Sequence, residues 1–293
     1  MPLGKFHKKF PFLNIEETIE FYSVFEGHPF LDFIKLDDDL FTCIQKNIIQ
    51  RISELKAYFV FDENASFQKD SESILMRLAI GDRKSYTVYK KENISQVRGR
   101  AIYKSLFEKN IIIKEKSREK PLREFQGQLI KKSLRNYTIQ DKIHFVNNFT
   151  RFWFNFIAPA IKNSLHKDEL LQNITNNIES FISLSFEELS NKLLIRNYKE
   201  ENIINHGSYW DKNIEIDLLI EEKNGTIIAG EAKWKKHKVC KNILNKLQTK
   251  CQKANLDADY FALFSKSGFS KELQTKNDKT VLLFELKDFE ELY

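Results

Sequence analysis

Cysteine is scarce in this chain, and the three present, Cys43, Cys240 and Cys251, never form a C-x-x-C pair. An odd number of isolated cysteines argues against a disulfide framework and against a structural zinc site. The six histidines are scattered and no H-E-x-x-H occurs, which argues against a catalytic zinc site as well.

Long hydrophobic runs are also missing. No stretch is long and apolar enough to span a bilayer, and the first residues, MPLGKFHKKF, lack the apolar core of a secretory signal peptide. We therefore expect a cytoplasmic protein without a membrane partner. With 293 residues, 42% of them hydrophobic and 30% charged, the composition is that of a globular protein able to bury two or three modest cores.

Positive charge is concentrated in one part of the sequence. The net charge is +6, but residues 90–135 hold 14 lysines and arginines against 5 acidic residues. Such a stretch favours an anionic partner, nucleic acid above all. The alternative is a solvated, lysine-rich surface encoded by an A/T-biased genome, which the abundance of Lys, Asn, Ile and Phe fits equally well.

The first 60 residues are expected to form a helical lead-in. Apolar residues recur at helical spacing in Ile15–Phe25 and again in Leu40–Leu55, with the turn-rich segment Glu26–Phe30 between them.

Residues 61–140 have the element order of a winged helix. Three predicted helices precede a predicted basic hairpin, in the order Ser71–Ala79, Thr87–Lys91, Ser95–Lys109, Ile111–Ile113 and Asn136–Ile139. Ser95–Lys109 would be the recognition helix. Winged helices also bind proteins, so DNA contact is one of two interpretations. Gly99 within this helix should weaken it by about 1 kcal/mol relative to alanine.

The residues expected to contact nucleic acid come from the recognition helix and from the wing, Lys114–Arg123. They are polar or basic, as contact with phosphates and base edges requires: Gln96, Arg98, Arg100, Lys104, Lys116 and Arg118.

Aromatic side chains crowd the connector at 141–172, where Phe145–Phe156 reads FVNNFTRFWFNF. A helix apolar over most of its circumference is normally buried. We therefore predict an interior helix joining two domains, with a base-stacking surface as the alternative.

From residue 173 to residue 293 the pattern becomes that of a mixed α/β domain. A helix through Phe181–Leu194 is followed by a hairpin around Asn224-Gly225. The remaining predicted elements are Asn242–Ala254 as a helix, Tyr260–Phe264 as a strand, a short helix from Lys271 and Val281–Glu285 as a strand.

The register of the hairpin decides whether its carboxylates meet. A two-residue Asn-Gly loop would point Asp217 and Glu231 to opposite faces, because strand side chains alternate. A three-residue loop, Lys223-Asn224-Gly225, instead pairs Glu222 with Thr226 and places Asp217 opposite Glu231. It also brings Lys233 to the same face and turns the apolar residues to the other face. We predict this second register.

Two carboxylates and a lysine on one sheet face suit metal-dependent phosphodiester hydrolysis. Asp217 and Glu231 would bind Mg²⁺ or Mn²⁺ with the carbonyl oxygen of Ala232, and Lys233 would orient water or stabilise charge at phosphorus. Glu187 could position the water of the metal or ligate a second ion if its helix packs beside the sheet. The alternative is a cross-strand salt-bridge ladder with Glu187 as a solvated helix carboxylate.

Five short pieces make the C-terminal segment resemble a known family: FEEL at 186–189, GSYW at 207–210, EIDLL at 215–219, GEAKW at 230–234 and FSKSGFS at 264–270. Their order and spacing resemble the C-terminal domain of archaeal-type DEXX-box ATPases, which is similar to PD-(D/E)XK nucleases. The resemblance implies a metal-dependent nuclease fold with Asp217, Glu231 and Lys233 at the core positions and Glu187 at the helix carboxylate.

The resemblance continues upstream, through FYSVFEGHPF at 21–30 and FTRFWFNFIAP at 149–159. Where the family usually has Gly-Gly-x-Pro, Glu26 replaces the first glycine. The ATPase is missing, because no G-x-x-x-x-G-K-[ST] occurs. Two explanations stay open: half of a split gene whose separately encoded ATPase associates with it, or a free-standing nuclease.

The resulting expectation is a mixed α/β protein in which helical and winged-helix regions precede a PD-(D/E)XK nuclease-like domain. It would be a Mg²⁺-dependent endonuclease that acts on nucleic acid, with duplex DNA as the expected substrate. The alternative is a non-catalytic DNA-binding or regulatory module, or the docking half of an ATPase. The sequence leaves homodimer formation open.

Overall fold

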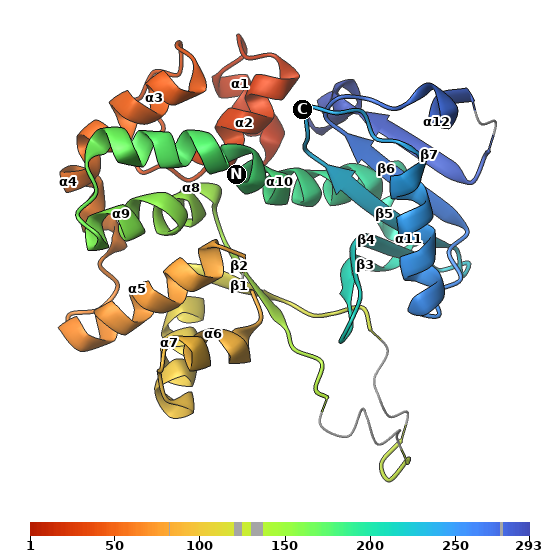
Figure 1. The fold of residues 1–293 in the computed structure, drawn as a ribbon, viewed down its shortest axis with the longest axis horizontal. Coiled ribbons are helices and arrows are strands. Elements are labelled where there is room, and N and C mark those ends of the chain that lie inside the picture. The colour runs from red at the N-terminus through yellow and green to blue at the C-terminus, as the bar shows by residue number, and fades with distance from the viewer. Residues whose placement is uncertain (82, 120–124, 130–136, 276–277) are drawn as a thin grey trace. The chain divides into compact units, whose positions relative to one another are not determined.

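The computed structural model describes residues 1–81, 83–119, 125–129, 137–275 and 278–293 (Figure 1). The chain forms two compact units. The first contains Met1–Glu115, Lys142–Ser185 and Tyr293, and the second contains Lys116–Asp141 and Phe186–Leu292. The first unit is mainly helical and the second holds a five-stranded sheet, which confirms the predicted mixed α/β class. The division into four segments at 60, 140 and 172 stays a prediction.

The first unit begins with short helices joined by tight turns. They are α1 (Leu3–Lys9), α2 (Ile15–Phe25), α3 (Leu40–Asn47) and α4 (Ile52–Leu55), with 3₁₀ turns at Ile49–Arg51 and Lys56–Phe59. The predicted bounds of α2, Ile15–Phe25, are confirmed. Asn14 and Glu17 form a capping box that fixes its start. The stretch Leu40–Leu55 is helical as predicted but is broken at Ile48, whose ψ of −61° accompanies a φ of −120°.

Three helices and a two-stranded hairpin follow, in the predicted order. They are α5 (Ala65–Ala79), α6 (Ser85–Lys91), α7 (Gln96–Glu108), β1 (Ile112–Glu115) and β2 (Lys142–Phe145). The predicted start of α5 at Ser71 is wrong, because the side chain of Asn64 caps the helix two turns earlier. β2 lies later than predicted: residues 137–139 are not in a strand, and Asn136 is outside the described residues.

The aromatic segment is buried, as predicted. It folds as α8 (Asn148–Phe152), a π-helical segment (Trp153–Ile157) and α9 (Ala158–Lys162). Phe149, Phe152 and Phe154 are each at most 1% exposed. The backbone N–H of Asn148 donates to Oε2 of the buried Glu26 at 2.9 Å, so this carboxylate satisfies the start of α8. The base-stacking alternative is therefore wrong for these three rings.

The second unit is built on one mixed sheet in the order β3-β4-β5-β6-β7. Its strands are β3 (Ile203–Trp210), β4 (Glu215–Glu222), β5 (Ile227–Lys233), β6 (Tyr260–Ser265) and β7 (Val281–Glu285). β3, β4 and β5 run antiparallel, whereas β5, β6 and β7 run parallel. The sequence did not predict β3, whose pairing with β4 is interrupted by two register shifts.

Helices accompany the sheet (Figure 1). The long helix α10 (Lys167–Asn197) precedes it, α11 (Lys241–Lys253) joins β5 to β6, and α12 (Lys271–Thr275) joins β6 to β7. Short 3₁₀ turns occupy Glu200–Asn202 and Leu286–Leu292. Among the described residues, no helix combines the length and the apolar character that crossing a bilayer requires.

Both faces of the sheet are apolar, which corrects the predicted division into one polar and one apolar face. Leu219, Ala229 and Leu263 share the face of Asp217 and Glu231, and they form a buried cluster with side chains of α11. On the opposite face Phe264 packs against Phe284 and Phe289, and Phe289 stacks on Phe186 of α10. The predicted site therefore lies on the face of the sheet that α11 covers.

Candidate active site

The hairpin of β4 and β5 positions the predicted site. Leu218 pairs with Gly230, and Glu221 pairs with Ile227. At the turn, the N–H of Glu222 donates to the carbonyl oxygen of Thr226 at 2.9 Å. Continued by one pair, this register places Asp217 opposite Glu231. The predicted three-residue loop is confirmed.

Local chemistry of the turn sets this register. Gly225 has a φ of +89°, and its N–H donates to the carbonyl oxygen of Glu222 at 2.9 Å. Such a left-handed conformation is easiest for glycine, which has no Cβ to clash. Oδ1 of Asn224 accepts from the N–H of Thr226 at 2.9 Å and closes the loop.

Three oxygen atoms converge on the ammonium group of Lys233. Its Nζ atom lies 2.7 Å from Oε1 of Glu231, 3.0 Å from the carbonyl oxygen of Ala232 and 3.5 Å from Oδ2 of Asp217. Oδ2 of Asp217 also accepts from the N–H of Ala232 at 3.1 Å, which holds the aspartate across the hairpin. The structure thus brings Asp217, Glu231, Ala232 and Lys233 together.

A second lysine, which the sequence analysis did not select, completes the cluster. Nζ of Lys250 on α11 donates to Oε2 of Glu231 at 2.7 Å, so Glu231 is held by a different ammonium group on each oxygen. A signal for Lys250 was available, since Lys246, Lys250 and Lys253 follow the spacing of one helix face. Placing that face against Glu231 required the packing of α11 on the sheet.

Burial governs the electrostatics of the cluster. Desolvation raises the pKa of Asp217 above its usual value, and the neighbouring Glu231 carboxylate adds to this effect. Burial by itself would lower the pKa of Lys233, but the carboxylates of Asp217 and Glu231 outweigh it and raise that pKa overall. The charged lysine is therefore favoured between the two acids.

Glu187 on α10 contributes to the electrostatics of this cluster. Its carboxylate is a further cause of the raised pKa of Lys233, so it lies within electrostatic range of the site. It does not join Asp217 and Glu231 in a compact triad, since no group of three or more His, Cys, Asp and Glu suited to a metal occurs in the described part of the chain. Its predicted role at the metal's water stays a prediction.

The donor set fits a magnesium ion. Mg²⁺ in proteins is commonly bound by one or two carboxylates, with water and phosphate completing its octahedron. Because one ammonium nitrogen reaches oxygens of Asp217, Glu231 and Ala232 within 3.5 Å, a single cation can be within reach of all three. Asp217, Glu231 and the Ala232 carbonyl would hold such an ion.

The residues predicted to contact nucleic acid differ in their surroundings. Gln96, Arg100 and Lys104 are exposed on α7. Arg98 is instead engaged with α5: Nε lies 3.0 Å from Oδ2 of Asp70, one terminal nitrogen donates to Oγ of Ser66 at 3.1 Å, and the guanidinium lies 4.9 Å from the centre of the Phe67 ring. These contacts hold the guanidinium against α5, and the predicted contact of Arg98 with nucleic acid stays a prediction.

The two wing residues, Lys116 and Arg118, belong to the second unit, whereas the α7 residues belong to the first. Ser117, between Lys116 and Arg118, fixes the chain to β3, because its Oγ donates to the carbonyl oxygen of Trp210 at 2.5 Å. The remaining wing positions from Lys120 to Arg123 lie outside the described residues.

Comparisons with known proteins cover the chain unevenly. Residues 153–247 match a family described as archaeal and bacterial proteins of unknown function, DUF234. No curated protein matches. The matched range contains Glu187 and the whole hairpin with Asp217, Glu231 and Lys233, but it ends before Lys250.

Two solved structures show a distant likeness. Protein VC1899 from Vibrio cholerae is 13% identical with a TM-score of 0.31; the match covers 83% of this chain and 54% of that one, so this chain spans about half its length. The other is a chain of the Thermococcus gammatolerans assembly of McrB AAA+ hexamers with bound McrC. It is 11% identical with a TM-score of 0.25, and the match covers 80% of this chain and 77% of that one. Likeness this low carries no argument about function.

Proposed function

We propose that this protein is a magnesium-dependent nuclease that hydrolyses the phosphodiester bonds of nucleic acid, with duplex DNA as the expected substrate. The observation that carries the proposal is the convergence of oxygen atoms of Asp217, Glu231 and the Ala232 carbonyl on one cation, the ammonium group of Lys233. In hydrolysis, a water oxygen bonds to phosphorus, the ester P–O bond breaks and the leaving oxygen takes up a proton.

The residues of the site suit separate parts of this reaction. Asp217 and Glu231 would hold the divalent cation, which supplies Lewis-acid stabilisation when bound. Lys233, kept charged by the two carboxylates, would donate to a non-bridging phosphate oxygen as negative charge develops there. Glu187 would accept a hydrogen bond from the attacking water.

The test is nicking of supercoiled plasmid DNA in the presence of Mg²⁺ or Mn²⁺. Wild-type protein is compared with Glu231→Ala and with Glu221→Gln, which changes an exposed carboxylate on the same hairpin. The proposal expects nicking by the wild type and by Glu221→Gln, and none by Glu231→Ala. Equal nicking by Glu231→Ala, or none by any of the three, contradicts it.

A non-catalytic role is the second candidate, as a regulatory module or as the docking half of a separately encoded ATPase. The observation that favours it is that both oxygens of Glu231 already have lysine partners, so the cluster is electrostatically complete without a metal. Calorimetric titration with Mn²⁺ in the presence of the tetranucleotide dTTTT separates the candidates. Heat of binding that disappears in Glu231→Ala supports the nuclease, and its absence in the wild type supports the non-catalytic role.

A further inference from the structure

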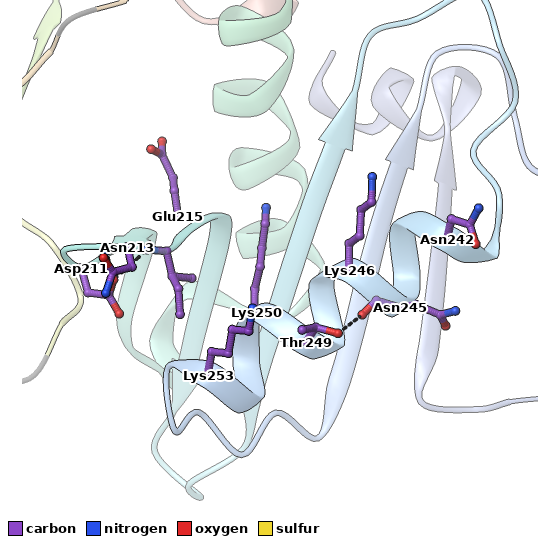
Figure 2. Close-up of a pocket in the computed structure, with 10 residues that line it drawn as sticks. Asp211, Asn213, Glu215, Asn242, Asn245, Lys246, Thr249, Lys250 and Lys253 are labelled. Carbon is purple, nitrogen blue, oxygen red and sulfur yellow. Dashed lines mark hydrogen bonds between the residues drawn. The ribbon is translucent and has the colours of Figure 1, made fainter.

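A cavity of about 770 Å³ lies within the second unit, and Figure 2 shows the residues that line it. α11 forms one side of it through Lys246, Lys250 and Lys253, and the segment between β3 and β4 contributes Asp211 and Asn213. Its volume falls in the range of sites for small organic ligands and cofactors. Lys250 both lines this cavity and binds Glu231, so the cavity and the cluster share one ammonium group.

The charges around the cavity favour an anion. Lys246 and Lys253 have no carboxylate partner among the described residues, and both are exposed. Three lysines at positions i, i+4 and i+7 of one helix repel one another, and an anion bound between them would relieve that repulsion. Together with the side-chain amides of Asn242 and Asn245, they provide ammonium and amide donors, whereas the Thr249 hydroxyl already donates to the carbonyl oxygen of Asn245 at 2.8 Å.

The acidic residues of the lining do not cancel this charge. Oδ1 of Asp211 accepts from the N–H groups of Asn213 and Ile214 at 2.6 and 2.7 Å, so this carboxylate is held by the turn. Glu215 is exposed at the start of β4 and is the second carboxylate of the lining. The lining therefore holds two carboxylates, one of them already satisfied by backbone donors, and three ammonium groups, of which Lys250 is already paired with Glu231.

We propose that this cavity binds phosphate groups of a nucleic-acid strand, and that Lys250 couples their binding to metal binding at Asp217 and Glu231. The proposal rests on the proposed nuclease function. A phosphate between Lys246, Lys250 and Lys253 competes with Glu231 for the Lys250 ammonium group. Once Lys250 turns to the phosphate, Oε2 of Glu231 becomes available to a divalent cation.

This competition has a defined thermodynamic consequence. Without a strand, Lys250 holds Glu231 and opposes metal binding. With a strand, the same ammonium group is drawn toward phosphate, so each ligand raises the affinity for the other by an equal factor. Lys250 is thus a positioning residue that keeps the metal affinity low until substrate is present.

The test measures binding by calorimetry with full-length protein. The ligands are Mn²⁺, inorganic phosphate, thymidine monophosphate and the tetranucleotide dTTTT, titrated singly, and dTTTT is also titrated with Mn²⁺ present. The variants are Lys246→Ala/Lys253→Ala, Lys250→Met and, as a control, Lys241→Ala. Lys241 is on the same helix but pairs with Glu272 at 2.9 Å.

The double variant should bind dTTTT about tenfold more weakly than the wild type, because two phosphate contacts are lost, and the control should change by less than about twofold. Lys250→Met should bind Mn²⁺ more tightly than the wild type when no oligonucleotide is present, and dTTTT should no longer raise its Mn²⁺ affinity. Equal dTTTT affinity of the double variant and the wild type overturns the site. Unchanged Mn²⁺ affinity in Lys250→Met overturns the coupling.

The remaining ligands identify the source of the phosphate. Tighter binding of dTTTT than of the monophosphate or inorganic phosphate supports a strand, whereas equal affinities overturn it in favour of a free phosphate or nucleotide. Failure of this inference is distinguishable from failure of the proposed function. If nicking depends on Glu231 but the lysine variants keep the dTTTT and Mn²⁺ affinities of the wild type, only the inference is contradicted. If dTTTT binding depends on the lysines but no nicking occurs, only the nuclease proposal is contradicted.

Discussion

The ring of Tyr89 on α6 lies directly against the backbone of Gly99 on α7. A Cβ atom at position 99 would stand 2.6 Å from Cγ of Tyr89 and 2.8 Å from its Cδ1. The sequence predicts a glycine that merely weakens the helix, whereas the structure shows why a larger residue does not fit. The close approach of α6 and α7 depends on the absence of this side chain.

Gly99→Ala is therefore expected to destabilise the protein. Overpacking against Tyr89 should cost about 2 kcal/mol, more than the roughly 1 kcal/mol gained from helix propensity. Urea unfolding of the first unit, followed by circular dichroism, measures the change. In a Tyr89→Ala background the same substitution should be neutral or stabilising; if it costs as much there, the ring contact is not the reason.

Lys233→Met is expected to destabilise the second unit by about 2 kcal/mol at neutral pH, because two buried carboxylates lose the cation between them. Folding raises the pKa of Asp217 above its unfolded value, so the aspartate's contribution becomes less favourable as pH rises above about 4. The cost should thus shrink when pH is lowered toward 4. Urea unfolding at several pH values measures it, with the exposed Lys235→Met as the control. A pH-independent cost contradicts the explanation.

Arg98→Ala and Arg100→Ala/Lys104→Ala should separate stability from DNA binding. Arg98→Ala removes contacts to Asp70 and Ser66 and should lower the free energy of unfolding by about 1 kcal/mol. The double variant should leave stability unchanged, weaken binding to duplex DNA and lower the slope of log K against log salt by about 1 to 2. Fluorescence anisotropy at several salt concentrations checks this. An unchanged slope favours a protein-binding role for α7.

His28 should make the first unit sensitive to acid. Burial, reinforced by the nearby Arg51 cation, lowers its pKa from 6.5 to about 4, and the side chain is packed against Phe149 at a ring distance of 4.4 Å. Between these values the unfolded chain binds the proton and the folded chain does not. Stability should therefore fall as pH drops from 6.5 to 4, by up to about 3 kcal/mol, and level off below 4.

The measurement for His28 is urea unfolding across this pH range. His28→Phe loses the hydrogen bond from the Phe30 N–H at 3.1 Å but should remove most of the acid sensitivity. His206→Gln, at an exposed histidine on β3, should retain the sensitivity of the wild type. Equal pH profiles for all three proteins would assign the acid sensitivity to other groups.

Features that are set by residues close together in the sequence were predictable. The capping residue Asn14 starts α2, and the sequence Lys223-Asn224-Gly225 sets a three-residue turn that aligns Asp217 with Glu231. Both depend on groups a few residues apart, whose geometry is restricted by backbone sterics and local hydrogen bonds. The hairpin part of the candidate site follows from this local chemistry.

Features that depend on packing between elements were not predictable in the same way. The pairing of β3 with β4 has two register shifts, and this irregularity hides the strand pattern of β3 in the sequence. Arg98 contacts α5, and α11 covers the sheet face that carries the carboxylates. Each outcome is decided by which surfaces meet, and side-chain spacing within one element does not contain that information.

The sequence by itself determined the turn, the alternation along β4 and β5, and hence the pairing of Asp217 with Glu231. Only the tertiary structure decided that Lys250, from a helix that follows in the chain, binds the second oxygen of Glu231 at 2.7 Å. The physical reason is that a strand's own period fixes which side chains share its face. The partner placed against that face is chosen by the burial of apolar residues such as Leu244 and Leu247, far from the charges themselves.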